Sequence, residues 1–407
     1  MARSDLIRQA CEQRGWGPSD LARAVGVAES GDPGRVHRAN ANRWMNGTRT
    51  PAYWWPHIAD VLGLDRDSPG RTPSGPGGGR APLAALARLT ETELPQNIRP
   101  GDVEEVQQAA LNLSQWHNSN GGGGLVRQTG TGQLAWAAAL LGVPCRQTLQ
   151  PQLFCAVAHL GMVTGAVCFD AFAHHDARQA FIFAAACAEA GGDWHLRCKI
   201  YSWRARHAVW TGEPDQALIH AEVASVRAER LTPSERAMLA IARARAHARL
   251  GDEQATLGAV GQADEEFSHA CPDQDPVWMS YYDHAQHQGD TGHALFDLAM
   301  TTRKPQHVQA ARERLAAASA QHTDAYLRSR VFSRTKLATL AVITGDVQEA
   351  ATIGALALQE STRIRSGRAD WGLRELALTT TRQRVTVPEA AELCERITRT
   401  TAKGAST

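Results

Sequence analysis

The spacing of apolar residues in the first part of the chain predicts four short helices. A glycine commonly ends a helix, and a proline commonly opens one. The expected boundaries are Ser4–Arg14 for the first helix, Pro18 or Ser19 to Gly26 for the second, Asn46-Gly47 as the end of the third and Pro51 as the start of the fourth. Four short helices predict a small all-α domain over residues 1–63.

Residues 64–81 contain Pro69, Pro73, Pro76 and the run Gly77–Gly79, with hardly an apolar residue. Such a stretch cannot bury enough surface to order itself and is expected to be a flexible linker. Helical spacing then resumes over Pro100–His117 and Gln133–Leu141, interrupted by Gly121–Gly124. Strand-like alternation is almost absent from there on, so residues 82–400 are expected to form a second, all-α domain.

This second part repeats itself. Helix-turn-helix joints are predicted near residues 176, 213, 252 and 290, which gives steps of 37, 39 and 38 residues, and a further joint falls at Gly345-Asp346. A period of 34–40 residues is typical of tetratricopeptide-like helical hairpins. Each hairpin has an apolar face that only stacking on its neighbour buries. The sequence therefore predicts an α-solenoid.

The third predicted helix has two different sides. Ala41 and Trp44 fall on one face. The other face carries the guanidinium and amide groups of Arg38, Asn40, Asn42 and Arg43. Groups of these kinds hydrogen-bond base edges and phosphates, and two short helices with a glycine-bearing connection are typical of the helix-turn-helix.

Positive charge is concentrated around this helix. Residues 35–49 include four arginines, and no acid lies between Asp32 and Asp60, although the whole chain has a formal net charge of only +1. A local positive strip favours binding to a polyanion. The alternative is an ordinary helical hairpin with a solvated basic face.

The run Asn42–Pro51, followed by Ile58–Gly63, resembles the XRE (Cro-type) helix-turn-helix family. This resemblance implies that Arg38, Ala39, Asn42 and Arg43 face the groove of duplex DNA and that Thr48 and Arg49 lie near phosphates. The sequence departs from the family at residues 28–37, an insertion where the family has a tight turn.

The second part resembles the tetratricopeptide-type sensor half of XRE regulators of the actinobacterial type. In those proteins a stretch similar to Arg99–Val103 precedes a glycine run similar to Gly121–Gly124, and helical repeats follow. The resemblance implies a regulator in which a helical array senses an effector.

The concave face of a solenoid is the expected binding surface, because solenoids hold partner segments there. Effector-binding candidates are Trp203, Arg206, His207 and Trp210 on one predicted helix, with Tyr281 and Tyr282 on an equivalent later helix. Arginine and aromatic side chains that point inward make a good binding lining. The alternative is that the aromatic residues form the core between repeats and that the arginines are solvated.

The sequence gives little indication of disulfides, a membrane span, a metal site or catalysis. The eight cysteines have no CxxC spacing, which fits free thiols in a reducing cytoplasm. No apolar leader opens the chain, and the apolar stretch Leu153–Phe169 is short for a membrane span, so we expect it to be a helix buried in the array. Two histidine groups, at residues 174–175 and at 284, 287 and 293, lack ligand spacing. We expect no metal, no cofactor and no enzymatic activity, since no catalytic motif is present.

Together these features predict a cytoplasmic, nucleoid-associated transcriptional regulator that binds double-stranded DNA, forms a homodimer and responds to a peptide, small-molecule or protein effector. The alternative is a protein-interaction scaffold whose N-terminal domain docks a partner instead of DNA.

Overall fold

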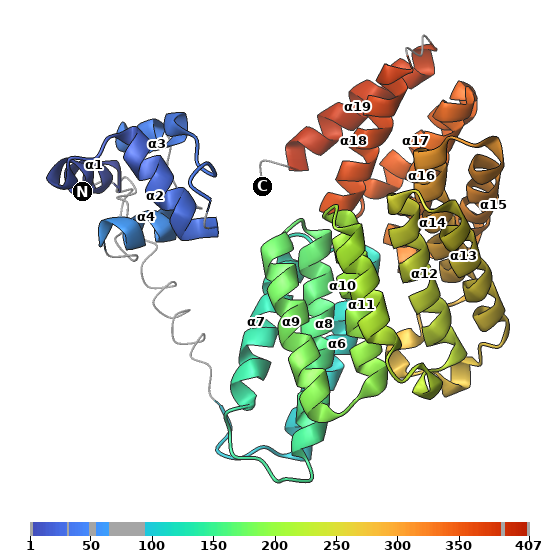
Figure 1. The fold of residues 1–407 in the computed structure, drawn as a ribbon, viewed down its shortest axis with the longest axis horizontal. Coiled ribbons are helices and arrows are strands. Elements are labelled where there is room, and N and C mark those ends of the chain that lie inside the picture. The colour runs from blue at the N-terminus through green and yellow to red at the C-terminus, as the bar shows by residue number, and fades with distance from the viewer. Residues whose placement is uncertain (1–2, 31, 49–53, 65–93, 384–386, 405–407) are drawn as a thin grey trace, which may run out of the picture. The chain divides into compact units, whose positions relative to one another are not determined.

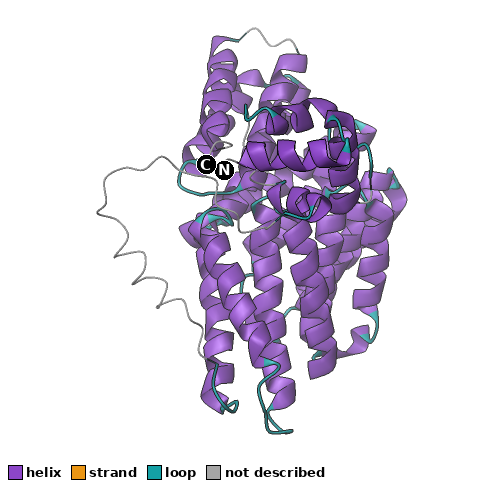
Figure 2. Cartoon of the chain, turned by 90° about the vertical axis from the view of Figure 1, so that its left-hand side faces the viewer, coloured by secondary structure: helices purple, strands orange, loops and turns teal. Residues whose placement is uncertain are grey.

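The structure, a computed structural model, describes residues 3–30, 32–48, 54–64, 94–383 and 387–404. Within these ranges it contains eighteen α-helices and four short 3-10 turns but no strand, which confirms the predicted all-α fold (Figure 2). The chain divides into two compact units, residues 1–91 and 92–407, each with its own core. The predicted linker, residues 64–81, lies outside the described residues except for Leu64.

The first unit consists of α1 (Arg3–Arg14), α2 (Pro18–Ser30), α3 (Arg38–Met45) and α4 (Trp55–Leu62), drawn in blue in Figure 1. Each helix contributes an apolar face to one core, in which Ile7, Leu21, Trp44 and Ile58 are almost fully buried. The ring of Trp44 lies 5.8 Å from that of Trp54, centroid to centroid. Aromatic burial of this kind supplies much of the driving force in a small core.

The predicted end of the second helix is wrong. Gly26 lies inside α2, which continues to Ser30. A β-carbon at Gly26 would lie 2.5 Å from the carbonyl oxygen of Asp32 and 3.3 Å from the β-carbon of Arg35. The glycine is therefore needed because the loop before α3 passes directly over the helix at this point. This loop is part of the insertion at residues 28–37.

The second unit contains all the remaining helices. They are α6 (Pro100–Asn120), α7 (Leu125–Leu140), α8 (Gln150–Asp170), α9 (His174–Gly191), α10 (Trp194–Trp210), α11 (Pro214–Ser225), α12 (Pro233–Leu250), α13 (Glu253–Ser268), α14 (His284–Thr302), α15 (Pro305–Gln321), α16 (Leu327–Thr344), α17 (Val347–Ser361), α18 (Gly367–Arg382) and α19 (Pro388–Gly404). The helix predicted from Gln133 in fact begins at Leu125, directly after the glycine run.

Successive helices from α8 to α17 pack as five hairpins: α8 with α9, α10 with α11, α12 with α13, α14 with α15, and α16 with α17 (Figure 1). Small residues allow the close approach. A β-carbon at Gly161 of α8 would lie 3.2 Å from Ala184 of α9, and one at Gly165 would lie 2.6 Å from the ring of Phe181. The apolar face of each helix is thus buried by its partner.

The first helices of the hairpins form a continuous inner row, because α8, α10, α12, α14 and α16 each pack against the next. The two ends of this row are joined by α6, which packs against both α8 and α16. The inner row and α6 therefore enclose an interior space, and this non-local closure positions the candidate site described below.

Helix α8 is the one helix in the described part of the chain that is long and apolar enough to cross a membrane. Of its apolar 18-residue window, 83% is buried inside the structure, which agrees with the prediction of a helix buried in the array. It is covered by helices on several sides, since α6, α7, α9 and α10 all pack against it.

One predicted joint of the repeat is wrong. Gly289-Asp290-Thr291 lie in the middle of α14, and the chain turns instead at Arg303, which has a φ of 58°. The cause is the preceding segment, residues 269–283, which forms two 3-10 turns, η2 (Pro272–Gln274) and η3 (Val277–Met279), and delays the next hairpin. Tyr281 and Tyr282 lie in this segment rather than on a helix, which corrects their predicted position.

Candidate functional site

Helix α3 presents the polar face that the sequence predicts. His37 caps the helix by accepting the backbone N–H of Ala39 on its Nδ1 at 3.2 Å. Ala41 and Trp44 are buried beneath the helix. The outward side chains of Arg38, Ala39, Asn42 and Arg43 are exposed, and Asn40 is half-buried.

Thr48 lies directly after α3, exposed, and its backbone N–H donates to the carbonyl of Arg43 at 3.0 Å. Arg49 lies outside the described residues. The charge of the strip is lower than its sequence indicates, because Glu29 of α2 forms an ion pair with Arg35 at 3.2 Å. Arg38 and Arg43 are the exposed arginines that remain on the helix itself.

In the second unit, a cavity of about 80 Å³ lies inside the ring formed by the inner row and α6. Such a volume holds several waters or a small polar group. The residues that line it include three of the predicted effector-binding residues: Trp203, Arg206 and Tyr281. Four cationic side chains lie on this wall: Lys199, Arg206, Arg328 and Arg368.

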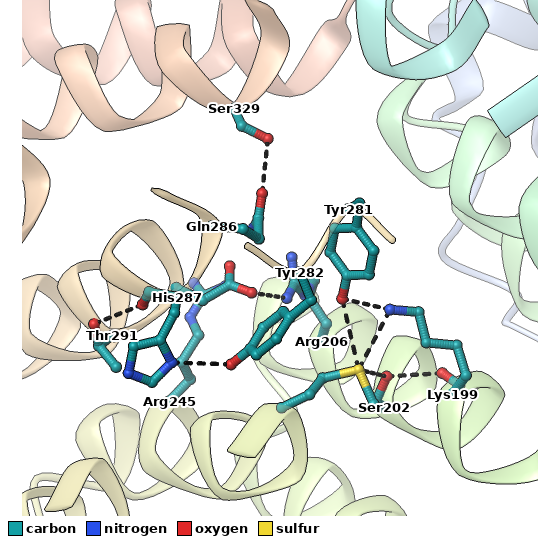
Figure 3. A network of polar contacts seen from close by, with 12 residues as sticks. Lys199, Ser202, Arg206, Arg245, Tyr281, Tyr282, Gln286, His287, Thr291 and Ser329 are labelled. Carbon is teal, nitrogen blue, oxygen red and sulfur yellow. Dashed lines mark hydrogen bonds and ion pairs between the residues drawn. The ribbon is translucent and has the colours of Figure 1, made fainter. Parts of the chain in front are cut away.

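Lys199 of α10 lies on the wall of this cavity, and no carboxylate of the described residues is at hydrogen-bond distance from its amine. Its ammonium contacts the hydroxyl of Tyr281 and lies 3.3 Å from the sulfur of Met238, an arrangement visible in Figure 3. Burial, followed by the repulsion of Arg206, lowers the pKa of Lys199 to about 7. This amine therefore changes its charge near neutral pH.

Arg206 has a carboxylate partner. Its Nη2 donates to Oδ2 of Asp290 at 2.9 Å, and its guanidinium lies 5.2 Å from the centre of the Trp203 ring. Burial alone would raise the pKa of Asp290, but Arg206 and the hydrogen bond from Gln286 outweigh it and hold the pKa below its usual range. Both side chains of the pair are therefore charged, and their charges cancel.

Arg328 and Asp170 form a second polar cluster at the point where the ring closes. Nη2 of Arg328 donates to Oδ1 of Asn118 at 2.9 Å, and Nη1 lies 3.7 Å from Oδ1 of Asp170. Asp170 is fully buried and also accepts the backbone N–H of Gly122 at 2.8 Å and the hydroxyl of Ser366 at 2.9 Å. One carboxylate thus connects α8, α16, the glycine run and the start of α18.

Arg368 of α18 differs from the other cations. Its guanidinium lies 4.4 Å from the ring centre of Phe169, 4.7 Å from that of Phe332 and 5.2 Å from that of Trp210. Within the described part of the chain it forms no hydrogen bond or ion pair, although only 6% of the residue is exposed. Burial lowers its pKa to about 9.

Several polar atoms around the cavity lack a partner. Among the described residues, the lining side chains with an unsatisfied buried nitrogen or oxygen are Trp278, His293, His322, Arg328, Ser333 and Arg368. Four histidines on the wall are held neutral because burial lowers their pKa: His117, His159, His293 and His322. Native interiors leave few such atoms unpaired, so their clustering here is notable.

The remaining predicted effector residues do not line this cavity. His207 is buried against Phe169, with ring centres 5.1 Å apart, and Tyr282 lies behind the wall, where its hydroxyl pairs with His287 at 3.3 Å. Trp210 lines a neighbouring cavity together with Trp371. Sequence analysis missed Lys199, Arg328 and Arg368, because each is a single basic residue on a helix whose neighbours give no sign of its inward direction.

The two histidine groups considered at the sequence level are not assembled into a site. His174 pairs with His207 at 3.2 Å, whereas Asp176 pairs with Arg127 at 2.5 Å. His287 pairs with Asp264 at 2.8 Å. Among the described residues, no three histidine, cysteine or acidic side chains are grouped so as to hold a metal ion.

A scan of the chain against models of protein families finds no match, and a search of curated proteins finds none either.

Proposed function

We propose that this chain is a sequence-specific, DNA-binding transcriptional regulator of the XRE type. In this proposal, residues 1–63 form a helix-turn-helix domain and residues 82–400 form a tetratricopeptide-like α-solenoid that binds an effector and mediates dimerisation. The protein would act in the cytoplasm, on the nucleoid.

The observation that carries the proposal is the register of α3. Trp44 and Ala41 anchor this helix in the core, and this leaves Arg38, Asn42 and Arg43 exposed along its outer side. A rod anchored in this way, with guanidinium and amide groups outward, has the form needed to enter a major groove. The insertion before α3 is tied to α2 by the ion pair between Arg35 and Glu29.

The second unit supports the sensor half of the proposal. Its five hairpins stack through their first helices, as expected for a solenoid, and they surround a polar cavity. A ligand in this cavity would favour one curvature of the array. In a dimer, a change in curvature would alter the spacing of two DNA-binding heads, and half-site spacing is a geometric requirement for operator binding.

The test uses the full chain and sheared genomic duplex DNA as the probe. Fragments retained by the wild-type protein are sequenced, and a duplex from the strongest site is used for affinity measurements. We expect Arg43→Ala to weaken binding by about 1–3 kcal/mol if Arg43 reads a base, or to reduce the salt dependence by about one counterion if it contacts a phosphate.

Arg14→Ala is the matched control. Arg14 is an exposed arginine of the same unit that makes a local hydrogen bond to the carbonyl of Ala10, at the end of α1. The Arg14→Ala variant should bind the duplex like the wild type. If Arg43→Ala and the wild type show equal affinity for the duplex and equal salt dependence, the proposal is contradicted. If the protein retains no discrete genomic fragments, the result would favour the alternative, in which the first unit docks a protein.

A further inference from the structure

Arg368 lies where two cavities of the second unit meet. The inner cavity, of about 80 Å³, and an adjoining cavity of about 190 Å³ share His293, Phe332 and Arg368 in their walls. Because Arg368 is common to both, a molecule that occupies both cavities would pass beside its guanidinium.

The inner cavity carries an excess of positive charge. Three guanidinium groups and the amine of Lys199 line it, whereas Asp290 is the one carboxylate among its described lining residues and is already paired with Arg206. Asp170, just behind the wall, is shared by Arg328, the glycine run and Ser366. Arg368 is left without an acidic partner at ion-pair distance in the described part of the chain. A buried cation without a counter-ion is unfavourable, so the site is arranged for an anion to enter.

The unsatisfied polar atoms point to the same conclusion. Nε of Arg368 and Nε of Arg328 are buried guanidinium donors without an acceptor, and the indole N–H of Trp278 is a third such donor. An oxyanion offers several acceptor lone pairs at once and forms strong hydrogen bonds to guanidinium groups. One carboxylate or phosphate group beside Arg368 and Arg328 could therefore satisfy donors from α18 and α16 at once.

The outer cavity has a different character. Its wall combines apolar and charged side chains, and Trp371 is 43% exposed, which places it toward the surface. The apolar members include Phe296, Met300, Trp210 and Trp371, and the charged members besides Arg368 are Arg245, Arg249, Asp297, Lys336 and Glu375. The rings of Trp210 and Trp371 lie 4.9 Å apart, centre to centre. The aromatic part of this wall offers a surface for an apolar or aromatic group next to the guanidinium of Arg368.

We propose that the two cavities bind one small organic anion, with its carboxylate or phosphate head beside Arg368 and Arg328 and its apolar body against Trp210 and Trp371. This inference rests on the proposed regulatory function and assigns the effector to a chemical class. The packing of α6 against both α8 and α16 closes the inner row, so the space suits a small molecule better than an extended peptide.

The test is isothermal titration calorimetry of the full chain at constant ionic strength, with chloride as the background anion. Benzoate and phenyl phosphate are the probes, and they distinguish a carboxylate from a phosphate head. Benzamide is the uncharged control for the aromatic body, and inorganic phosphate is the control for the head alone. We expect saturable binding of benzoate or phenyl phosphate that exceeds the binding of both controls. Absence of saturable binding by both probes would overturn the proposal.

Arg368→Met tests the residue itself. Methionine is apolar and flexible enough to pack against the three rings. We expect the affinity for the bound probe to fall at least about tenfold, since a charge-assisted contact is lost. Arg396→Met, at an exposed position on α19, is the matched control and should bind like the wild type. Unchanged affinity in Arg368→Met would overturn the proposal.

The melting temperature of ligand-free Arg368→Met gives a second readout. If Arg368 is retained to bind a ligand, removing its buried charge should leave the melting temperature unchanged or raise it. A lower melting temperature together with normal probe binding would assign Arg368 to stability alone and overturn the proposal. The titration contains no DNA, so its result does not depend on whether α3 binds a duplex.

Discussion

Arg206 of α10 and Asp290 of α14 form a buried ion pair, with Nη2 2.9 Å from Oδ2, although 84 residues separate them along the chain. The pair joins α10 and α14, which both pack against α12 in the inner row, at the wall of the cavity. Although Gly289 and Asp290 resemble a turn in the sequence, they lie in the middle of α14, on the wall of the cavity.

Removal of this carboxylate should destabilise the second unit. Asp290→Asn leaves the guanidinium of Arg206 buried without a counter-ion, and such changes typically cost about 3–5 kcal/mol. Urea unfolding followed by circular dichroism measures the effect. Asp273→Asn, at an exposed position in η2, is the control and should change stability by less than about 0.5 kcal/mol. Similar stability of the two variants would show that the pair contributes little.

Lys199 should make stability depend on pH. Burial lowers its pKa to about 7 from a usual value of 10.5, so between these values the unfolded chain binds one more proton than the folded chain. The free energy of unfolding therefore rises with pH across that window, by up to about 1.4 kcal/mol per pH unit. Below pH 7 the cost of burying the charged amine of Lys199 is constant, because the amine is protonated in both the folded and the unfolded chain. The charged or titratable groups that face it are His159, Cys198, Arg206, Glu235, Tyr281 and Asp290.

Lys199→Met should remove this dependence. Urea unfolding between pH 6.5 and 9 is expected to show the variant gaining most over the wild type at the acidic end, with the difference shrinking as pH rises. The control is Lys304→Met, because Lys304 is an exposed lysine that pairs with Glu253 at the surface. If the free energies of unfolding of Lys199→Met and the wild type differ by a constant amount across this range, the amine of Lys199 does not become neutral in the folded chain.

Gly26→Ala tests the close approach of the insertion to α2. Alanine favours a helix by about 1 kcal/mol over glycine, but its β-carbon would lie 2.5 Å from the carbonyl oxygen of Asp32. We expect a net destabilisation of the first unit by about 1–3 kcal/mol, measured by thermal unfolding. Gly258→Ala, at an exposed position within α13 with nothing within 4 Å, should instead stabilise the second unit. Stabilisation by both changes would contradict the observed path of the loop.

Replacement of Gly122 by alanine should also be destabilising, for a different reason. A β-carbon there would lie 2.3 Å from the carbonyl oxygen of Val167 and 2.9 Å from the β-carbon of Asp170, and the backbone N–H of Gly122 is bonded to that carboxylate. We expect Gly122→Ala to lower the stability of the second unit by about 2 kcal/mol or more in urea unfolding. Gly101→Ala, which meets nothing within 4 Å, serves as the control. An equal effect of both changes would mean that the glycine run does not need its close contact with α8.

The local elements of this protein could be predicted because their signals are local. Trp44 and Ala41 are three residues apart, so helical periodicity alone places them on one face of α3. Gly212, Gly251 and Gly345 end their helices with φ of 80°, 79° and 85°, a conformation that glycine adopts without strain. The failures, at Gly26 and at Gly289-Asp290, occur where a glycine lies inside a helix. Gly26 allows the loop before α3 to approach α2 closely, and the turn expected at residue 290 falls at Arg303 because the segment 269–283 delays the hairpin.

The sequence by itself determined which segments are helical and which face of α3 is buried, because these depend on residues within one or two turns of each other. Only the tertiary structure decided that Lys199, Arg206, Arg328 and Arg368 share one cavity. Their meeting depends on α6 packing against α16, more than 200 residues away along the chain. Helical periodicity cannot predict a contact between residues so far apart. That contact is produced by the stacking of all the hairpins between α6 and α16.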